Sequence, residues 1–334
     1  MAGRGAFLAA PRASYVLPIL CTRAGSDMDD LTDYLHRISE HAELVIVDGS
    51  AESIFERNHA IWGPLGTHIR PDVRHRCLNG KAWGVMTGVH AASREFVIVA
   101  DDDVRYDEPE LHEVVRALAQ ADLVRPQNFF EPLPWHAAWD TARTLLNRSI
   151  GSDHPGTFGV RRSTLIGAGG YDGNVLFENL ELVRTIEAIG ASVVDRPDVL
   201  VRRVPPTVER FWSQRVRQAY DDLSQPLRMA AFLAVLPATA LAIGLRRVRW
   251  LLVGAGAVVA LAEGGRRRQG GRRVFRARCL VFAPAWVLER GVCVWLALWL
   301  RLRGGVPYRG RTIVLAANPS RRLRAQAEAG RFLR

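Results

Sequence analysis

Short β-branched runs alternate with amphipathic stretches through residues 14–204, and this alternation restricts the fold more than any other feature of the sequence. Apolar runs bounded by turn signals predict buried strands, whereas apolar residues three and four positions apart predict helices. Alternating strands and helices build a largely parallel sheet with helices on its faces. We therefore expect an α/β domain over residues 14–204, after an N-terminal tail of residues 1–13. The expected strands are 15–20, 43–47, 73–78, 95–100 and 192–194, and the expected helices are 27–40, 80–92, 108–120 and 178–189, with Ser26 or Asp27 as the first N-cap.

The last third of the chain differs in composition from the domain before it. Residues 227–334 contain 21 arginines and three acidic residues, a net charge of +18, whereas residues 1–226 have a net charge of −7. The same third carries the longest apolar runs of the sequence. Positive charge beside apolar runs indicates a membrane with anionic lipids as the partner and does not favour nucleic acid.

Three apolar runs fit a bilayer to different degrees. Residues 229–245 contain no charge over 17 positions, the lower limit for a spanning helix, and residues 250–262 cover only 13 positions. Residues 279–300 are long enough but contain the pair Glu289-Arg290, and charges at mid-membrane are costly. A membrane region over residues 228–304 is therefore expected, either with two spans and an interfacial segment or with three spans.

Arginine clusters indicate how this region is oriented. Residues 266–278 and a basic tail over residues 305–334 are expected in the cytosol, because positively charged loops stay on that side. This favours two spans in a multi-pass protein of the cell (inner or plasma) membrane, with a cytosolic catalytic domain. The arginines of residues 246–249 would then face outward, against the same rule. The N-terminus has no sustained apolar core and the four cysteines form no CxxC pair, so we expect neither a cleaved signal nor a disulfide framework.

A helix is expected over residues 207–222, inside a segment of residues 205–227 that joins the two parts. Its apolar residues, Phe211 and Trp212 among them, recur at helical spacing, and its other face collects polar and basic side chains. An amphipathic helix directly before an apolar run suits the headgroup level of a membrane. Packing on the sheet of the first domain is the alternative.

Acidic side chains follow two of the expected strands. Asp48 follows the second, and Asp101, Asp102 and Asp103 follow the fourth. The carboxyl ends of parallel strands meet at the edge where such sheets bind ligands, so both groups are candidates for chemistry. Asp101 and Asp103 can share one hard cation bridged to a diphosphate, for which Mg²⁺ or Mn²⁺ is suited. An acidic turn that caps the next helix is the alternative.

Lys81 is the only lysine of the chain. It opens an expected helix after Asn79 and Gly80, where free backbone N–H groups and a cationic side chain suit a phosphate or the edge of a nucleotide. A solvated surface lysine is the alternative. Asp48 could accept hydrogen bonds from a base or a ribose, or could serve ordinary turn chemistry.

The order of these motifs resembles the family 2 glycosyltransferases over residues 14–222, and within them the membrane-associated type of the ceramide glucosyltransferases and hyaluronan synthases. The residues that carry the resemblance are Asp48-Gly49-Ser50, Asn79-Gly80-Lys81-Ala82, Ala100-Asp101-Asp102-Asp103-Val104, Gly159-Val160-Arg161-Arg162, Gly169-Gly170-Tyr171-Asp172 and Phe177-Glu178-Asn179-Leu180-Glu181-Leu182. Residues 214–218 are similar to the Q/R-x-x-R-W element of the membrane-embedded members, and residues 306–311 to the W-x-G-R tail that follows their last membrane segment.

The resemblance implies a GT-A fold, a UDP-sugar or GDP-sugar donor, Mg²⁺ or Mn²⁺ on a DxD motif, and inversion at the anomeric carbon. Carried over by position, Asp101 and Asp103 form the DxD motif, with Asp103 as the direct metal ligand and Asp101 nearer the ribose. Lys81 and Arg217 would stabilise the departing diphosphate, and Asp48 would contact the nucleoside. The full set expected to bind the nucleotide or substrate is Asp48, Lys81, Asp101, Asp102, Gln214 and Arg217.

Two positions depart from the family pattern. Asn179 stands where the family usually has an aspartate base, and an amide cannot accept the proton of the acceptor hydroxyl. Glu178, one residue earlier, or Glu181, one turn later, must then serve, and Glu178 is favoured. Gln218 replaces the tryptophan of the membrane element, which favours transfer of a single sugar over processive synthesis.

Together these features predict a membrane-bound inverting hexosyltransferase that moves one sugar from a nucleotide sugar to a lipid or glycolipid acceptor. A catalytically silent relative that binds a nucleotide sugar or a partner enzyme is the alternative, with Asn179 as its main support. A nucleotidyltransferase is less favoured, because residues 22–26 provide no Gly-rich phosphate loop.

Overall fold

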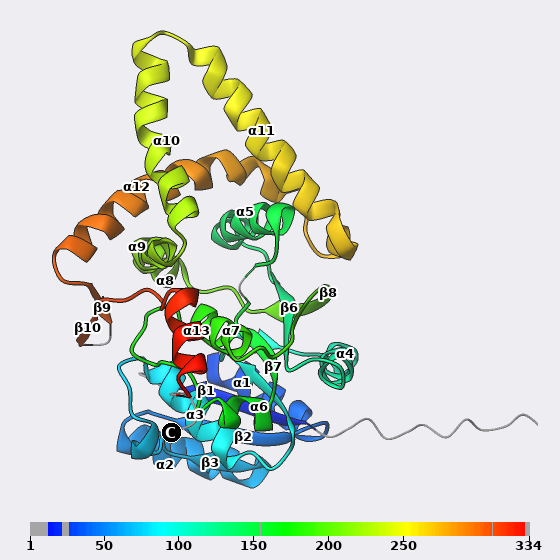
Figure 1. Cartoon of the computed structure of the whole chain (residues 1–334). Helices are drawn as coiled ribbons and strands as arrows, with labels where there is room; N and C mark the ends of the chain where they lie inside the picture. Colours follow the sequence, from blue (N-terminus) through cyan, green and yellow to red (C-terminus); the bar gives the residue numbers. More distant parts are fainter. Residues whose placement is uncertain (1–12, 22–26, 154, 309, 331–334) are drawn as a thin grey trace, which may run out of the picture.

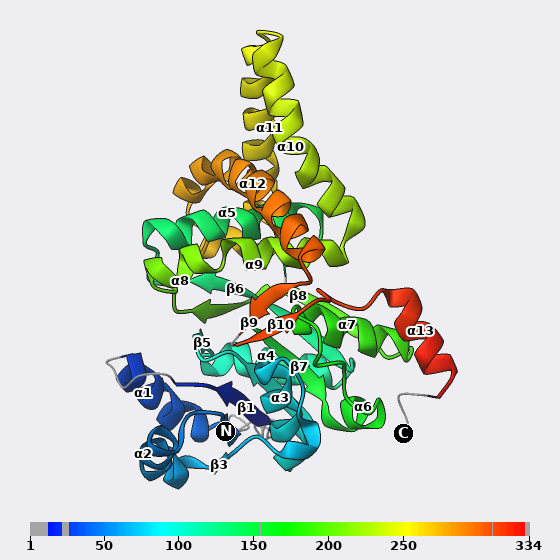
Figure 2. The ribbon, with the colours of Figure 1, turned by 90° about the vertical axis from the view of Figure 1, so that its left-hand side faces the viewer.

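Eight strands form one sheet at the centre of the first domain (Figures 1 and 2). The computed structural model describes residues 13–21, 27–153, 155–308 and 310–330. The spatial order is β3-β2-β1-β4-β7-β6-β8-β5, parallel from β3 to β4 and between β6 and β8, with β7 antiparallel to both its neighbours. The strands are β1 (Ser14–Ile19), β2 (Glu43–Asp48), β3 (Thr67–Ile69), β4 (Phe96–Ala100), β5 (Val104–Arg105), β6 (Leu123–Phe130), β7 (Thr157–Arg161) and β8 (Val193–Arg203).

Helices cover both faces of this sheet, which confirms the expected α/β architecture. On one face α1, α2 and α4 bury Tyr34, Trp62 and Leu118 against β1, β2 and β4. On the other face α3, α6 and α7 bury Val85, Leu165 and other apolar side chains. The helices are α1 (Asp27–Ser39), α2 (Glu52–Trp62), α3 (Gly80–Ala91), α4 (Glu108–Leu118), α6 (Arg162–Gly167) and α7 (Glu178–Ala188), with one 3₁₀ turn, η1 (Gly63–Leu65), after α2.

One expected strand is wrong, and several elements were not foreseen. Residues 73–78 alternate in polarity but begin with a 3₁₀ turn, η2 (Val73–His75), because the Asp72 side chain accepts a hydrogen bond from the Arg74 N–H. The sequence pattern did not predict the strand β6, because Gln127 and Asn128, both buried, interrupt its apolar run. The expected cap Ser26 lies outside the described residues.

Three C-terminal helices are long and apolar enough to cross a membrane: α10 (Pro226–Gly244), α11 (Val248–Arg267, continuing into η4, Arg268–Arg273) and α12 (Ala283–Leu302, preceded by η5, Ala277–Phe282). The pair α10 and α11 forms a hairpin that projects away from the domain (Figures 1 and 2). Only 6% of the apolar stretch of α10 and 11% of that of α11 is buried in the chain, against 39% for α12. The hairpin therefore offers its apolar surface to the surroundings far more than α12 does.

The helix α12 lies across the domain, over α5 (Trp135–Ile150) and α9 (Arg215–Tyr220) (Figure 2). The charged pair that interrupts its apolar run faces the protein. Glu289 Oε2 accepts a hydrogen bond from Trp139 Nε1 at 3.0 Å and lies 3.6 Å from Arg215 Nη1. Arg290 Nε lies 3.4 Å from Asp222 Oδ2. Each charge of the pair therefore has an oppositely charged side chain of the same chain within 4 Å.

The helix expected over residues 207–222 is broken into α8 (Val208–Ser213) and α9, followed by η3 (Asp221–Ser224). Arg215 explains the break, because its Nε donates to the Phe211 carbonyl at 3.0 Å, the acceptor that a continuous helix would offer to the Arg215 N–H. The same guanidinium forms a buried bidentate pair with Asp140, at 2.7 and 3.0 Å. The segment is thereby packed on the domain, while Trp212 stays about half exposed at 52%.

The chain end returns to the first domain. Strands β9 (Val306–Tyr308) and β10 (Arg311–Ile313) form a small hairpin, and α13 (Ser320–Glu328) packs against α7. The N–H groups of Leu176 and Phe177 donate to the carbonyls of Leu315 and Ala316, at 2.9 and 2.8 Å. The described part of the tail is therefore a structural neighbour of the α7 N-terminus.

Candidate active site

Lys81 lies in the first turn of α3, at the carboxyl edge of the sheet. Asn79 caps this helix, and its Oδ1 accepts from the N–H groups of Lys81 and Ala82 at 3.0 and 3.4 Å. The cap fixes the direction in which the Lys81 side chain leaves the helix.

The Lys81 ammonium joins the ends of β4 and α7. Its Nζ lies 2.6 Å from Asp101 Oδ1, 3.0 Å from Glu178 Oε1 and 3.1 Å from Asn179 Oδ1. Although burial lowers the pKa of Lys81, the two carboxylates raise it above its ordinary value, so the group is a fixed cation. This geometry excludes the alternative of a solvated surface lysine.

A second cation, Arg203, completes the cluster from the end of β8. Its Nε lies 2.9 Å from Asp103 Oδ1 and its Nη2 lies 3.2 Å from Asp101 Oδ2. Gly156 permits this approach, since an added Cβ there would lie 2.5 Å from Asp101 Oδ2 and 3.1 Å from Arg203 Cζ. The sequence reading missed Arg203, because it expected β8 to cover only residues 192–194. We call Lys81, Asp101, Asp103, Glu178 and Arg203 the charge cluster.

The pKa values of the two aspartates in the cluster shift in opposite directions. Burial raises the pKa of Asp101, but Lys81 and Arg203 outweigh it and the net shift is downward. Burial also raises the pKa of Asp103, and Arg203 only partly offsets the nearby carboxylates of Asp101 and Asp102, leaving a value of about 6. The backbone carbonyl of Asp102 accepts a hydrogen bond from Arg105 Nη1 at 2.7 Å.

A divalent cation fits the donor set of this cluster. The carboxylates of Asp101 and Asp103 both contact the Arg203 guanidinium and offer hard oxygen donors. Mg²⁺ and similar ions need only one or two protein carboxylates when a phosphate supplies further oxygens. Among the described residues no group of three or more His, Cys, Asp or Glu side chains has the arrangement of a metal site. Any such ion would therefore depend on the substrate for much of its coordination.

The structure brings Glu178, and not Glu181, to the cluster. Besides Lys81, Glu178 contacts Asn79, whose Nδ2 donates to Oε2 at 3.3 Å. Glu181 is fully buried, and both its oxygens accept from Asn318, at 2.7 Å from the backbone N and 2.8 Å from Nδ2. Glu181 thus connects Asn318 to α7, and of the two expected bases only Glu178 belongs to the charge cluster.

Asp48 is buried beside the β2 end and does not reach the charge cluster. Its carboxylate accepts from the Ser50 N–H and from Asn58 Nδ2, both at 2.8 Å, and lies 3.4 Å from His68 Nε2. Burial raises the pKa of Asp48, but the hydrogen bonds from His68, Ser50 and Asn58 outweigh this effect and lower the pKa to about 2. This geometry fits the turn-forming role that stood as the alternative to nucleoside contact.

Substitution of Asp48 by asparagine is expected to destabilise the protein by about 2 kcal/mol at pH 7. The folded-state pKa lies below the unfolded value of 3.8, so this stabilisation is complete above about pH 4 and is lost as the pH falls toward about 2. Thermal unfolding of wild type and Asp48→Asn at pH 7, 4 and 3 checks this. A difference between the two proteins that stays constant down to pH 3 would refute the assignment.

The segment of α8 to η3 reaches the same edge through Arg217. Its guanidinium carbon lies 5.7 Å from the centre of the Tyr308 ring, and the Tyr308 hydroxyl donates to Asn79 Oδ1 at 3.4 Å. Gln214 caps the break between α8 and α9, and its carbonyl accepts from the Gln218 N–H. Of these two expected substrate-binding residues, Arg217 is thus linked to the N-terminus of α3.

Asp221 is a further acidic residue near this edge that sequence reasoning missed. Its Oδ1 is buried and has no hydrogen-bond partner among the described residues. Burial raises the pKa of Asp221 to about 7, against the effect of Arg217 and Arg290, and Glu178 adds to the rise. Asp221 belongs to none of the sequence motifs, and only the burial of its side chain in the folded chain distinguishes it.

Comparison with known proteins identifies the fold. No protein-family model and no curated protein matches the chain. Among solved structures it is similar to a mannosyltransferase from Pyrobaculum calidifontis in complex with GDP-Man and Mn²⁺, at 17% identity and a TM-score of 0.52, over 85% of this chain and 87% of that one. Glucosyl-3-phosphoglycerate synthase from Mycobacterium tuberculosis matches at 18% identity and a TM-score of 0.41, over 61% and 76%. The chain has a GT-A-like fold followed by three apolar helices.

Proposed function

We propose that this chain is an inverting glycosyltransferase of the family 2 type that transfers a single sugar from a UDP-sugar or GDP-sugar donor to a lipid-linked or membrane-associated hydroxyl. The charge cluster is the observation that carries the proposal. It places one fixed ammonium and one guanidinium beside a carboxylate, at the edge where this fold binds ligands. Such a group can bind a diphosphate and accept a proton within one site.

In the proposed reaction the acceptor hydroxyl attacks C1 of the donor sugar from the face opposite the diphosphate. Glu178 takes the hydroxyl proton as the new C1–O bond forms, and the bond from C1 to the diphosphate oxygen breaks with its electron pair on that oxygen. Lys81, Arg203 and Arg217 stabilise the negative charge that develops on the departing nucleoside diphosphate. The configuration at C1 is inverted because a single displacement takes place.

Mg²⁺ or Mn²⁺ is the cofactor that this cluster suits. Asp103 would be its direct ligand and Asp101 a second one nearer the ribose, both with hard oxygen donors. When bound, the ion adds positive charge beside the donor diphosphate. Lys81 and Arg203 hold both carboxylates in place whichever sugar the donor carries.

The apolar helices support a membrane-associated acceptor. The 19 residues of α10 span about 28 Å at the helical rise of 1.5 Å, close to the thickness of a bilayer core. With α11 they form the exposed hairpin. In the proposed arrangement this hairpin is inserted in the membrane, α12 lies at the membrane surface, and the catalytic domain is in the cytosol. Trp135 and Trp212, with ring centres 6.2 Å apart and both exposed, suit the headgroup level.

A catalytically silent protein that binds a nucleotide sugar is the second candidate. Asn179 favours it, because its amide holds Lys81 and donates to the Pro155 carbonyl at 3.0 Å without any capacity to take a proton. The position of Glu178 beside the same lysine favours the enzyme instead.

A thermal-unfolding screen of UDP-sugars and GDP-sugars, with and without Mn²⁺, tests donor binding. A ligand at 100 times its dissociation constant stabilises the folded state by about 2.7 kcal/mol, which raises the unfolding temperature by several degrees. We expect one donor to do so, with the effect dependent on Mn²⁺ and reduced in Asp103→Ala. If no nucleotide sugar shifts the transition, both candidate functions fail.

A further inference from the structure

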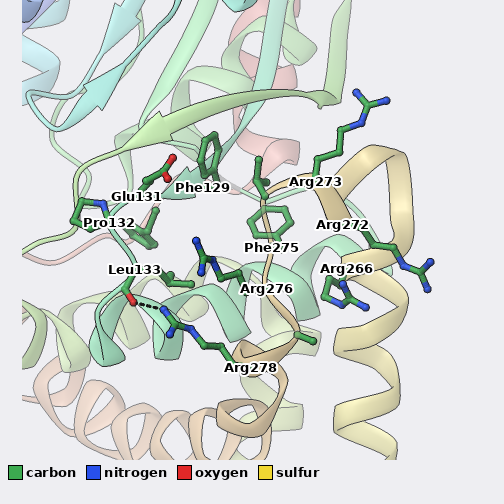
Figure 3. A pocket seen from close by; sticks show the side chains of 13 residues that line it. Phe129, Glu131, Pro132, Leu133, Arg266, Arg272, Arg273, Phe275, Arg276 and Arg278 are labelled. Carbon is green, nitrogen blue, oxygen red and sulfur yellow. Dashed lines mark hydrogen bonds between the residues drawn. The ribbon is translucent and has the colours of Figure 1, made fainter.

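A cavity of about 680 Å³ lies at the base of the α10–α11 hairpin (Figure 3). It lies between the end of β6 and the segment from η4 to η5, which we call the connector. None of the charge-cluster residues lines it, although its wall residue Phe130 pairs with Arg203 in the register of β6 and β8. The cavity is therefore a separate site that adjoins the reaction site through the sheet.

Positive charge dominates this cavity. Five arginines line it against one acidic residue, Glu131. The lining arginines are Arg266, Arg272, Arg273, Arg276 and Arg278. In Figure 3 Arg276 lies beside Phe275, whereas the guanidinium groups of Arg272 and Arg273 point away from that ring, and Arg278 Nη2 donates to the Leu133 carbonyl at 2.8 Å.

Three of the five arginines have no carboxylate partner in the described part of the chain. Arg266 forms an ion pair with Glu263 at 2.5 Å, and Arg272 lies 3.7 Å from the same carboxylate. Arg273, Arg276 and Arg278 have no carboxylate within 4 Å in the part of the chain that the structure describes, and Arg278 donates instead to the Leu133 carbonyl. Exposed guanidinium groups without an internal partner are suited to a phosphate, which they can bind through two parallel hydrogen bonds.

The connector that carries these arginines is held rigidly on the domain. Arg148, which is 1% exposed, donates from its guanidinium to the carbonyls of Gly265 and Arg268, at 3.2 and 2.6 Å. Its plane also lies over the ring of Phe275, with 5.1 Å from its Cζ to the ring centre. The chain reverses at Gly270, where φ is +73°, and so returns from α11 into the cavity wall. The site is thus formed by fixed elements.

The position of the cavity indicates the source of the phosphate. It lies where the apolar stretch of α11 ends at the domain surface, and Phe129, Leu133 and Phe275 give it an apolar side beside the charges. A free phosphate would use the arginines alone, whereas a membrane lipid would use both surfaces.

We propose that this cavity binds the phosphate headgroup of an anionic membrane lipid and thereby holds the catalytic domain at a fixed orientation on the bilayer. The inference rests on the membrane association in the proposed function, and it does not depend on sugar transfer. Lipid binding and donor binding can therefore fail independently.

The test measures the unfolding temperature of the full chain in neutral detergent micelles during titration with phosphatidylglycerol. The double variant Arg273→Gln/Arg276→Gln is compared with Arg321→Gln/Arg322→Gln, which removes the same charge from two exposed arginines on α13. Wild type and the α13 variant should be stabilised equally. The cavity variant should need about 30-fold more lipid, which corresponds to about 2 kcal/mol for two basic residues.

Two further arms identify the source of the phosphate. Phosphatidylcholine should stabilise the proteins much less than phosphatidylglycerol, and millimolar inorganic phosphate should have no comparable effect. Equal responses of all three proteins to phosphatidylglycerol would overturn the site. Equal stabilisation by phosphatidylcholine, or by inorganic phosphate, would overturn the assignment to an anionic lipid. Unfolding without lipid checks that both double variants are folded.

Discussion

Replacement of Lys81 by alanine is expected to reduce sugar transfer at least about 100-fold, the scale seen when one group that stabilises a developing negative charge is removed. Among the described residues, Lys81 is the one side chain that contacts Asp101, Glu178 and Asn179 together. Without it, two carboxylates face each other with less compensation, and the departing diphosphate loses an ammonium partner. The measurement is the rate of sugar release or transfer from the donor identified by the binding screen.

Arg74→Ala is the matched control for Lys81→Ala. Arg74 is also a cation near the start of α3, but it is exposed, and in the part of the chain that the structure describes its ion pair is with Asp72, two residues earlier. Its removal should leave transfer within about twofold, since exposed ion pairs contribute little. A Lys81→Ala protein that keeps most of the wild-type rate would show that the charge cluster is structural.

Glu178→Gln is expected to lower turnover by about 100-fold to 10,000-fold, the usual contribution of a positioned general base. The amide keeps the size of the side chain but cannot take the acceptor proton. Donor binding should survive, because Lys81 and Arg203 remain. Rates of transfer and the donor-induced rise in unfolding temperature are measured on the same preparation.

Glu181→Gln provides the internal control on the same helix. Glu181 accepts two hydrogen bonds from Asn318 in a buried setting, so its variant should lose stability while the folded molecules keep their turnover. The reverse pattern, with turnover lost in Glu181→Gln and kept in Glu178→Gln, would exchange the two roles. Full turnover in both variants would leave the proton acceptor to another group.

Much of the site could be predicted because its residues occupy places that local sequence marks. Asp101 and Asp103 follow an apolar strand, Lys81 follows a capping asparagine, and Glu178 begins a periodic helix. These signals are short in range, and the fold brings them to one edge since parallel strands end there. Residue type and local pattern were enough to choose Asp101, Asp103 and Lys81, whereas Glu178 was chosen through the resemblance to the family 2 glycosyltransferases.

Other features depend on contacts between distant parts of the chain, and sequence reasoning did not reach them. Arg203 lies a hundred residues beyond Asp103, at the end of a strand whose later half has a mixed pattern. Asn318 holds Glu181 across 137 positions, so the structural role of that glutamate has no local signal. The burial of Asp48 by Asn58 and His68 is likewise a tertiary effect.

In the membrane region, too, local sequence predicted some features and only tertiary contacts explain others. Apolar runs predicted three candidate helices, but only tertiary contacts explain why Glu289 and Arg290 are tolerated in the last one. Their partners Arg215 and Asp222 come from the segment expected to be a single amphipathic helix. The helix breaks in that segment because Arg215 is placed against Asp140 and Glu289.

The most direct test of the central claim follows a labelled sugar. Purified wild type and Glu178→Gln, reconstituted with membrane lipids and Mn²⁺, receive the nucleotide sugar that stabilises the protein. The proposed function predicts label in the organic-solvent extract with wild type, and label at background with Glu178→Gln although both bind the donor. Equal label from both proteins would contradict it. A wild type that neither labels lipid nor hydrolyses the donor would contradict it as well.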